Sequence, residues 1–107
     1  LVDSVLSYQQ ESGYFTWQLQ ATEGPVDTSA TAMIGFALQQ GIQKGLLPES
    51  GYQQALEKCR QALEKSIRNG NLYDCSGECE GFARYPQRYG AYPWALGPGL
   101  QVFAAFQ

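Results

Sequence analysis

The chain has 107 residues, which fits one domain with a single modest core. Its 44% hydrophobic and 16% charged residues are typical of a globular protein and exclude a disordered one. The net charge of -3 excludes a basic nucleic-acid surface, and the absence of histidine removes the commonest metal ligand and general base. We therefore expect no nucleic-acid partner, no metal and no cofactor.

The cysteines do not form a disulfide pattern, because three is an odd number. Cys59 falls in an apolar helical pattern and is expected to be buried. Cys75 and Cys79 alone make a poor zinc site, since such a site needs four ligands. No apolar run reaches the ~20 residues that cross a bilayer, and no charged-then-apolar leader opens the sequence. These features indicate a cytoplasmic protein without a membrane partner.

Residues 1–26 are expected to form a lead-in helix followed by an aromatic loop. Val5, Leu6 and Tyr8 provide the apolar positions of a short helix. The residues after it are dense in aromatic side chains, which favours an extended segment that presents Trp17. Trp17 is equally consistent with stacking on a ligand and with packing under the loop.

Residues 27–68 are predicted to form a helical hairpin. Apolar residues recur at spacings of three and four along both halves of this range. Gly45 is a suitable C-terminal stop for the first helix, and Ser50 with Gln53 would form a capping box for the second. Because the link between them is short, the two helices should pack antiparallel.

The start of the first helix carries an unusual cluster of polar residues. Asp27, Thr28 and Ser29 are each competent N-caps. They could also hydrogen-bond a polar ligand at the helix N-terminus, where the dipole favours an anion. For Asp27 we favour capping over ligand contact.

Residues 69–97 are expected to form a long loop rich in glycine, proline and aromatic residues. Loops of this length are more often functional than idle. Tyr92 and Trp94 are the best candidates for stacking on a substrate, and Arg88 could pair with a carboxylate or remain a surface charge. The candidate acids of the loop are Asp74, Glu78 and Glu80, of which Glu78 and Glu80 are more simply interpreted as solvated charges. Arg84, like Arg88, could pair with a carboxylate or remain a surface charge.

Residues 98–107 are predicted to form an inner helix, with Gly97 as its cap and Pro98 in its first turn. The helix is apolar on nearly all sides, so it needs partners that this chain only partly supplies. An outer helix with a charged face beside an apolar inner helix predicts an all-α fold, part of an α/α toroid in which inner helices line a central cavity.

The stretch "DTSATAMIGFALQQGIQKGLL", followed by "YQQALEKCRQAL", resembles the C-terminal third of the unsaturated glucuronyl and rhamnogalacturonyl hydrolases, glycoside hydrolase families 88 and 105. Trp17 and Gln18 match residues that the family carries shortly before this helix. Cys79 and Gly81 match a later family segment, where Phe82 replaces the family's threonine. The resemblance extends over residues 13–107.

The resemblance implies a six-hairpin barrel of bacterial carbohydrate metabolism that removes a Δ4,5-unsaturated uronic acid from oligosaccharides left by polysaccharide lyases. In that reaction an aspartate protonates the vinyl ether double bond and water adds to C5. The family's catalytic aspartates lie in the earlier two thirds of the barrel and have no counterpart here, so we expect this chain alone to be inactive. The remainder of the barrel or a second copy is then an expected partner.

The expected substrate-binding residues are Trp17, Asp27, Thr28, Ser29, Arg88, Tyr92 and Trp94. A different hypothesis is a helical-hairpin interaction module without catalysis. The chain shows no internal repeat with a period of about 33 to 47 residues, which arrays of such hairpins require.

Overall fold

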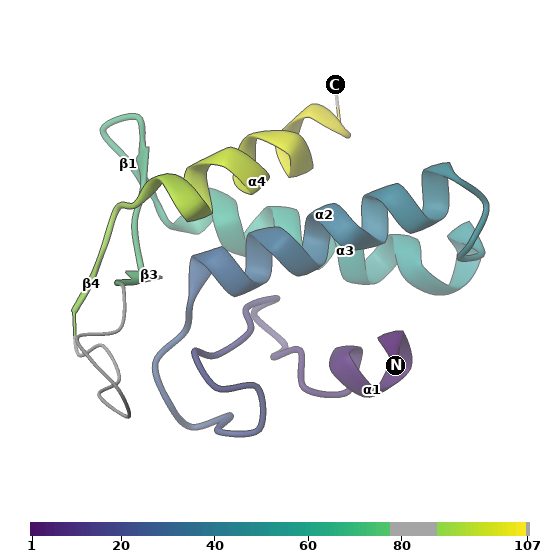
Figure 1. Ribbon diagram of the computed structural model, residues 1–107, viewed down its shortest axis with the longest axis horizontal. Coiled ribbons are helices and arrows are strands. Elements are labelled where there is room, and N and C mark those ends of the chain that lie inside the picture. The colour runs from purple at the N-terminus through teal and green to yellow at the C-terminus, as the bar shows by residue number, and fades with distance from the viewer. Residues whose placement is uncertain (78–87, 107) are drawn as a thin grey trace.

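The computed structural model describes residues 1–77 and 88–106, and this part of the chain contains four helices and four short strands. Figure 1 shows how the helices are arranged. The elements are α1 Val2–Leu6, α2 Thr28–Gln43, α3 Glu49–Lys65, β1 Ile67–Arg68, β2 Asn71–Leu72, β3 Cys75–Ser76, β4 Tyr89–Gly90 and α4 Pro93–Ala104. Within the described ranges, no helix is both long and apolar enough to cross a membrane.

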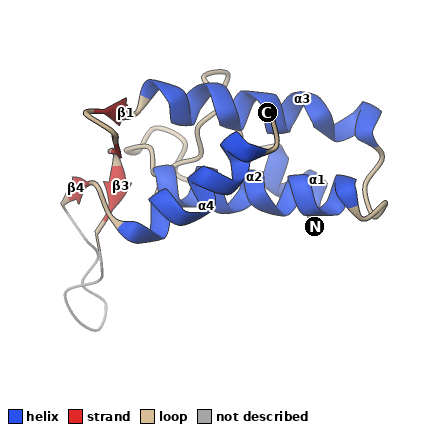
Figure 2. Ribbon diagram, turned by 90° about the horizontal axis from the view of Figure 1, so that it is seen from above, coloured by secondary structure: helices blue, strands red, loops and turns tan. Residues whose placement is uncertain are grey.

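The helices form an open, curved layer around α2. α2 and α3 pack antiparallel, as the short link predicts, and α4 packs mainly on α2 and runs parallel to it (Figures 1 and 2). α1 lies on the opposite side of α2 and α3 from α4 (Figure 1). The arrangement places the first residues of α2 and α4 at the same end of the molecule.

The core lies where α2, α3 and α4 meet. Gly35 of α2 stands at this junction: a Cβ built on it would lie 3.0 Å from Cγ2 of Val102 and 3.2 Å from Cβ of Cys59. The lack of a side chain therefore lets three helices approach one point. Among the residues that the structure describes, ten buried ones form the core cluster: Phe15, Ala32, Leu38, Leu56, Cys59, Leu63, Leu72, Cys75, Ala95 and Val102. The burial of Cys59 agrees with its expected place on an apolar helix face.

Five residues, 44–48, separate the end of α2 from the start of α3. Gly45 has a φ of +74°, the left-handed conformation that ends helices, and this confirms its role as a stop. α3 then begins at Glu49 with Pro48 as its N-cap and no side-chain cap. The predicted capping box is therefore wrong, because Ser50 already lies inside the helix and cannot cap it.

The region after α3 contains more regular structure than the predicted loop. β1 and β2 pair antiparallel with Ile67 opposite Leu72, and Asn69 and Gly70 both have positive φ. Two consecutive residues of this kind form the tight turn that favours Asn-Gly. β3 pairs with β4, with Ser76 opposite Tyr89. The predictions for Glu78, Cys79, Glu80, Gly81, Phe82 and Arg84 lie outside the described residues.

The inner helix starts five residues earlier than predicted. α4 begins at Pro93, with Tyr92 as its N-cap, and Pro98 lies in its interior. Pro93 already supplies the fixed φ and missing N–H that suit a first turn, so the signal at Pro98 is redundant. Gly97, the predicted cap, also lies inside α4 and does not cap it. Gly99 allows α4 to approach β2 closely, because a Cβ there would lie 2.9 Å from Cδ2 of Leu72.

α4 leaves an apolar face uncovered. Leu96 and Leu100 lie one turn apart and are 38% and 59% exposed, whereas Ala95, Gly99 and Val102 on the opposite side are buried. The helix carries no charged residue. This agrees with the expectation that the inner helix needs more partners than the chain supplies.

Candidate functional site

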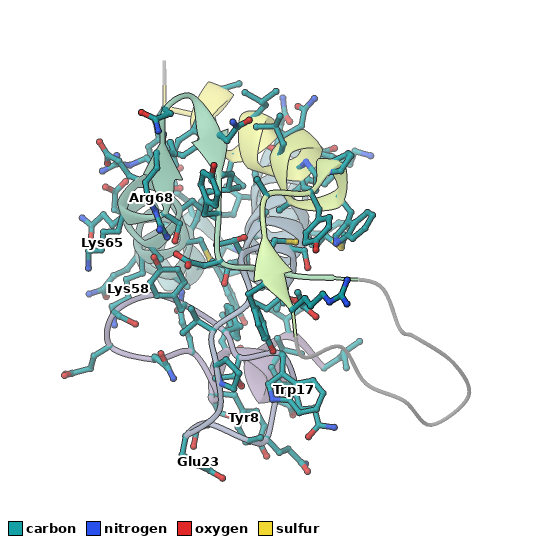
Figure 3. The ribbon with its side chains drawn as sticks, turned by 90° about the vertical axis from the view of Figure 1, so that its left-hand side faces the viewer. Tyr8, Trp17, Glu23, Lys58, Lys65 and Arg68 are labelled. Atoms are coloured by element: carbon teal, nitrogen blue, oxygen red, sulfur yellow. The ribbon has the colours of Figure 1, made fainter. Side chains whose placement is uncertain are left out.

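The site lies at the end of the molecule where α2 and α4 begin. β3 and β4 lie at this end, and so does the loop that precedes α2, which is seen with Trp17 in Figure 3. Three separate stretches of the sequence therefore converge here: the loop that leads into α2, β3, and β4 with the start of α4. The first backbone N–H groups of α2 are already bonded within the protein, since the N–H of Thr28 donates to the carbonyl of Asp74 at 3.0 Å.

Asp27 caps α2, as expected from its position. Oδ1 of Asp27 accepts from the backbone N–H of Ser29 at 3.1 Å, and both carboxylate oxygens lie 2.8 Å from the Ser29 hydroxyl. Oδ1 also accepts from the backbone N–H of Ser76, in β3, at 2.9 Å. The side chain is only 7% exposed, so the carboxylate is committed to protein groups.

The hydroxyls after Asp27 tie α2 to its neighbours. The Thr28 hydroxyl donates to the backbone carbonyl of Tyr73 at 2.8 Å, and Thr28 is fully buried. The Thr31 hydroxyl accepts from the N–H of Phe15 and donates to the carbonyl of Asp27, both at 3.0 Å. Thr28 and Ser29 thus stand inside the fold, and neither hydroxyl is directed to solvent.

Tyr92 and Trp94 form the aromatic surface of the site. Their ring centroids lie 4.7 Å apart and the ring planes differ by 7°, so one ring covers the other. The Trp94 indole N–H donates to the carbonyl of Ser76 at 3.0 Å, and 37% of the residue is exposed. Tyr92 also lines a pocket of about 210 Å³ together with Leu72 and Leu96. The structure brings these two predicted residues together.

The other two predicted contacts lie on adjoining segments. Trp17 is half-buried in the lead-in loop. Its backbone N–H donates to the carbonyl of Pro25 at 3.1 Å, next to the β-bridge between Thr16 and Val26. Arg88 is exposed just before β4, and its carbonyl accepts from the N–H of Gly77 at 3.0 Å. The backbone of Arg88 is therefore joined to the end of β3.

Burial governs the protonation of the groups around Asp27. The pKa of the Cys75 thiol is raised mainly by burial and further by the charge of Asp27, although a hydrogen bond with Ser29 opposes the shift. The pKa of the Tyr89 hydroxyl is raised by the same two causes. Both groups stay protonated at neutral pH, so Cys75 is not a thiolate nucleophile.

Asp74, a candidate acid from the loop, has a structural role. Its carboxylate accepts from the Ser66 hydroxyl at 2.7 Å and pairs with Arg68 at 2.9 Å, and the Ser66 hydroxyl also meets that of Tyr14 at 2.6 Å. Within residues 1–77 and 88–106, histidine, cysteine and acidic side chains form no group of three that could hold a metal ion.

Sequence reasoning missed Ser76 and Tyr89. Ser76 joins Asp27 to Trp94 through its backbone, and Tyr89 pairs with it across the two strands. A backbone contact leaves no trace in residue type. The one feature of the sequence that could have indicated Ser76 is the glycine that follows it, Gly77. A Cβ on Gly77 would lie 3.1 Å from the hydroxyl of Tyr92.

Comparisons with known proteins agree with this architecture. A possible member of glycoside hydrolase family 105 from Klebsiella pneumoniae matches with a TM-score of 0.86 and 17% identity, over 98% of this chain and 29% of its own. A family 88 glycosyl hydrolase from Bacteroides vulgatus matches with a TM-score of 0.83 and 23% identity, over 98% and 32%. A family 105 glycoside hydrolase from C. acetobutylicum gives 0.79 and 24%, over 98% and 35%.

The chain thus spans about a third of the length of these solved structures. They confirm the predicted fold, a helical partial toroid. No curated protein sequence matches the chain. The sequence model of Glycosyl Hydrolase Family 88 matches residues 1–97, so the chain belongs to this family.

Proposed function

We propose that this chain is part of a glycoside hydrolase that acts on unsaturated uronyl oligosaccharides produced by polysaccharide lyases. The observation that carries the proposal is the family 88 match over residues 1–97. In this proposal the chain contributes a substrate-binding wall, and the general acid lies in the part of the barrel outside it. The pairing of Asp74 and the enclosure of Asp27 support that division, because neither carboxylate is placed to donate a proton to a ligand.

Tyr92 and Trp94 would contact the sugar. A pyranose ring packs on an aromatic face through its C–H groups, and Tyr92 holds Trp94 in a fixed orientation while leaving part of it exposed. Trp17 and Arg88 would extend this surface, with the guanidinium of Arg88 as a partner for the uronate carboxylate. Asp27, Thr28 and Ser29 would support the wall from within and not touch the sugar.

The uncovered apolar surfaces would meet the remainder of the barrel or a second copy. One is the face of α4 around Leu96 and Leu100; the other is an apolar pocket of about 200 Å³ between α1 and α2, lined in part by Val5 and Ile34. The two lie on opposite sides of the layer, as expected of an arc with two open edges (Figure 1).

These edges can be tested by sedimentation of the isolated chain. We expect concentration-dependent association through the apolar faces, weakened in Leu100→Lys and unchanged in the exposed control Glu49→Lys. A chain that remains monomeric at every concentration, with no effect of Leu100→Lys, would contradict this assignment of the edges.

Binding and turnover test the function itself. Calorimetry with an unsaturated glucuronyl disaccharide should show weak binding, with a dissociation constant on the order of 1 mM, lost in Trp94→Ala and kept in Leu46→Ala at the far end of the molecule. Absorbance of the conjugated double bond should persist when the disaccharide is incubated with this chain alone. Binding unaffected by Trp94→Ala, or turnover by the isolated chain, would refute this division of roles.

A further inference from the structure

β3 lies between the cap of α2 and the aromatic pair, and it bonds to both. The N–H of Ser76 donates to Oδ1 of Asp27 at 2.9 Å, and the carbonyl of the same residue accepts from the indole of Trp94 at 3.0 Å. The next residue, Gly77, has no side chain, and a Cβ there would lie 3.1 Å from the hydroxyl of Tyr92. The backbone of β3 therefore adjoins both aromatic rings.

Asp27 is held in place by hydrogen bonds from both its backbone and its carboxylate. The backbone N–H of Asp27 donates to the carbonyl of Phe15 at 2.9 Å, and its carboxylate holds three further donors from Ser29 and Ser76. Phe15 is fully buried in the core. Charge-assisted hydrogen bonds to a buried carboxylate are shorter and stronger than neutral ones.

We infer that Asp27 is a positioning residue that sets the orientation of the Tyr92–Trp94 surface through the backbone of Ser76. The inference rests on the proposed function for its meaning in sugar binding, but its geometry stands independently of that function. Trp94 uses its only hydrogen-bond donor on the carbonyl of Ser76, so the placement of β3 determines the direction in which the exposed indole faces.

Two substitutions separate capping from positioning. In Asp27→Ser the hydroxyl can still cap α2, because serine and aspartate are comparable N-caps, but its shorter side chain cannot also reach the N–H of Ser76. In Asp27→Asn the amide carbonyl retains an acceptor for both contacts. A role in capping alone predicts that both variants resemble the wild type, whereas positioning predicts that only Asp27→Asn does.

The chain has two tryptophans and seven tyrosines, so Trp17→Phe leaves Trp94 as the single tryptophan, whose emission is followed with excitation beyond the tyrosine absorption band. In that background we expect Asp27→Ser to increase acrylamide quenching of Trp94 about twofold and to weaken the near-ultraviolet circular dichroism of the stacked rings. Asp27→Asn should restore both signals, and Ser50→Ala in α3 should change neither. Disaccharide affinity should fall about tenfold in Asp27→Ser, the loss expected for a misplaced aromatic contact.

A folded Asp27→Ser chain with unchanged Trp94 quenching would overturn the inference. Changed quenching with no disaccharide binding even by the wild type would instead refute the proposed function and leave the positioning role intact. Should Asp27→Ser fail to fold, hydrogen exchange of the wild type decides the question. The Ser76 amide and the Trp94 indole N–H should be protected and open together, and an indole that exchanges freely in the folded chain would also overturn the inference.

Discussion

Replacing Gly35 with alanine is expected to destabilise the fold, although alanine favours a helix. The new Cβ would lie 3.0 Å from Cγ2 of Val102 and 3.2 Å from Cβ of Cys59. Neither neighbour can move aside easily. Val102 is a buried β-branched residue with one preferred rotamer in a helix, and Cβ of Cys59 is fixed to the backbone of α3. The helices themselves would have to separate.

The expected magnitude follows from two opposing effects. Glycine to alanine in a helix interior contributes about 1 kcal/mol of stability, whereas an extra methyl in a packed core costs about 1–3 kcal/mol. The net loss should be about 1 kcal/mol in urea denaturation, which lowers the melting temperature by roughly 4 °C for a chain of this size.

Gly51→Ala is the matched control for Gly35→Ala. Gly51 also lies in a helix, but a Cβ there meets nothing within 4 Å, so the substitution should stabilise the chain by up to about 1 kcal/mol. In a double-mutant cycle, Val102→Ala should cost less when Gly35 is already alanine. Equal stabilisation by Gly35→Ala and Gly51→Ala would refute the argument that Gly35 is required for close helix packing.

Gly13→Ala should cost more than about 2 kcal/mol in urea denaturation, since Gly13 has a φ of +97° and a Cβ would lie 2.1 Å from the carbonyl oxygen of Lys58; a milder loss would contradict this geometry. Ser66→Ala should cost about 1–3 kcal/mol, because the fully buried hydroxyl donates to Asp74; unchanged urea stability would show that the bond is dispensable. Burial raises the pKa of Cys59 from 9.0 to about 12 in the folded chain. As the pH rises past 9.0, the unfolded chain loses the thiol proton while the folded chain keeps it, so the free energy of unfolding falls. Between about pH 8 and about pH 10 the wild type should therefore lose more stability than Cys59→Ala, with a slope of up to about 1.4 kcal/mol per pH unit, and equal slopes would exclude the effect.

The local features of α2 could be predicted because the residues that cause them are adjacent in the sequence. Asp27 bonds to Ser29 two residues later, and Gly45 adopts the positive φ that stops the helix. The start of α4 could not be placed with the same rule. Two prolines five residues apart, Pro93 and Pro98, both resemble a first helical turn, and the local sequence does not decide between them.

The candidate site was only half accessible to sequence reasoning. Tyr92 and Trp94 stand out by residue type at the start of an apolar helix, and their stacking agrees with a shared role. The link from Asp27 to Trp94 depends instead on the backbone of Ser76, whose position follows from the register of β3 with β4. The register of these two short strands is set by the tertiary fold, so it cannot be predicted from a pattern of residues.

The packing of α4 on α2 also has a consequence for the order in which the parts of this segment arise. α2 and α3 are joined by five residues and can pair as soon as both exist, whereas α4 follows α3 only after residues 66–92. During synthesis, a growing chain that has emerged as far as Lys65 already holds the hairpin but lacks both aromatic rings. The stacked pair of Tyr92 and Trp94 is therefore made only after the hairpin is complete, and a chain that terminates before it would also lack the part of the core that Ala95 and Val102 of α4 supply.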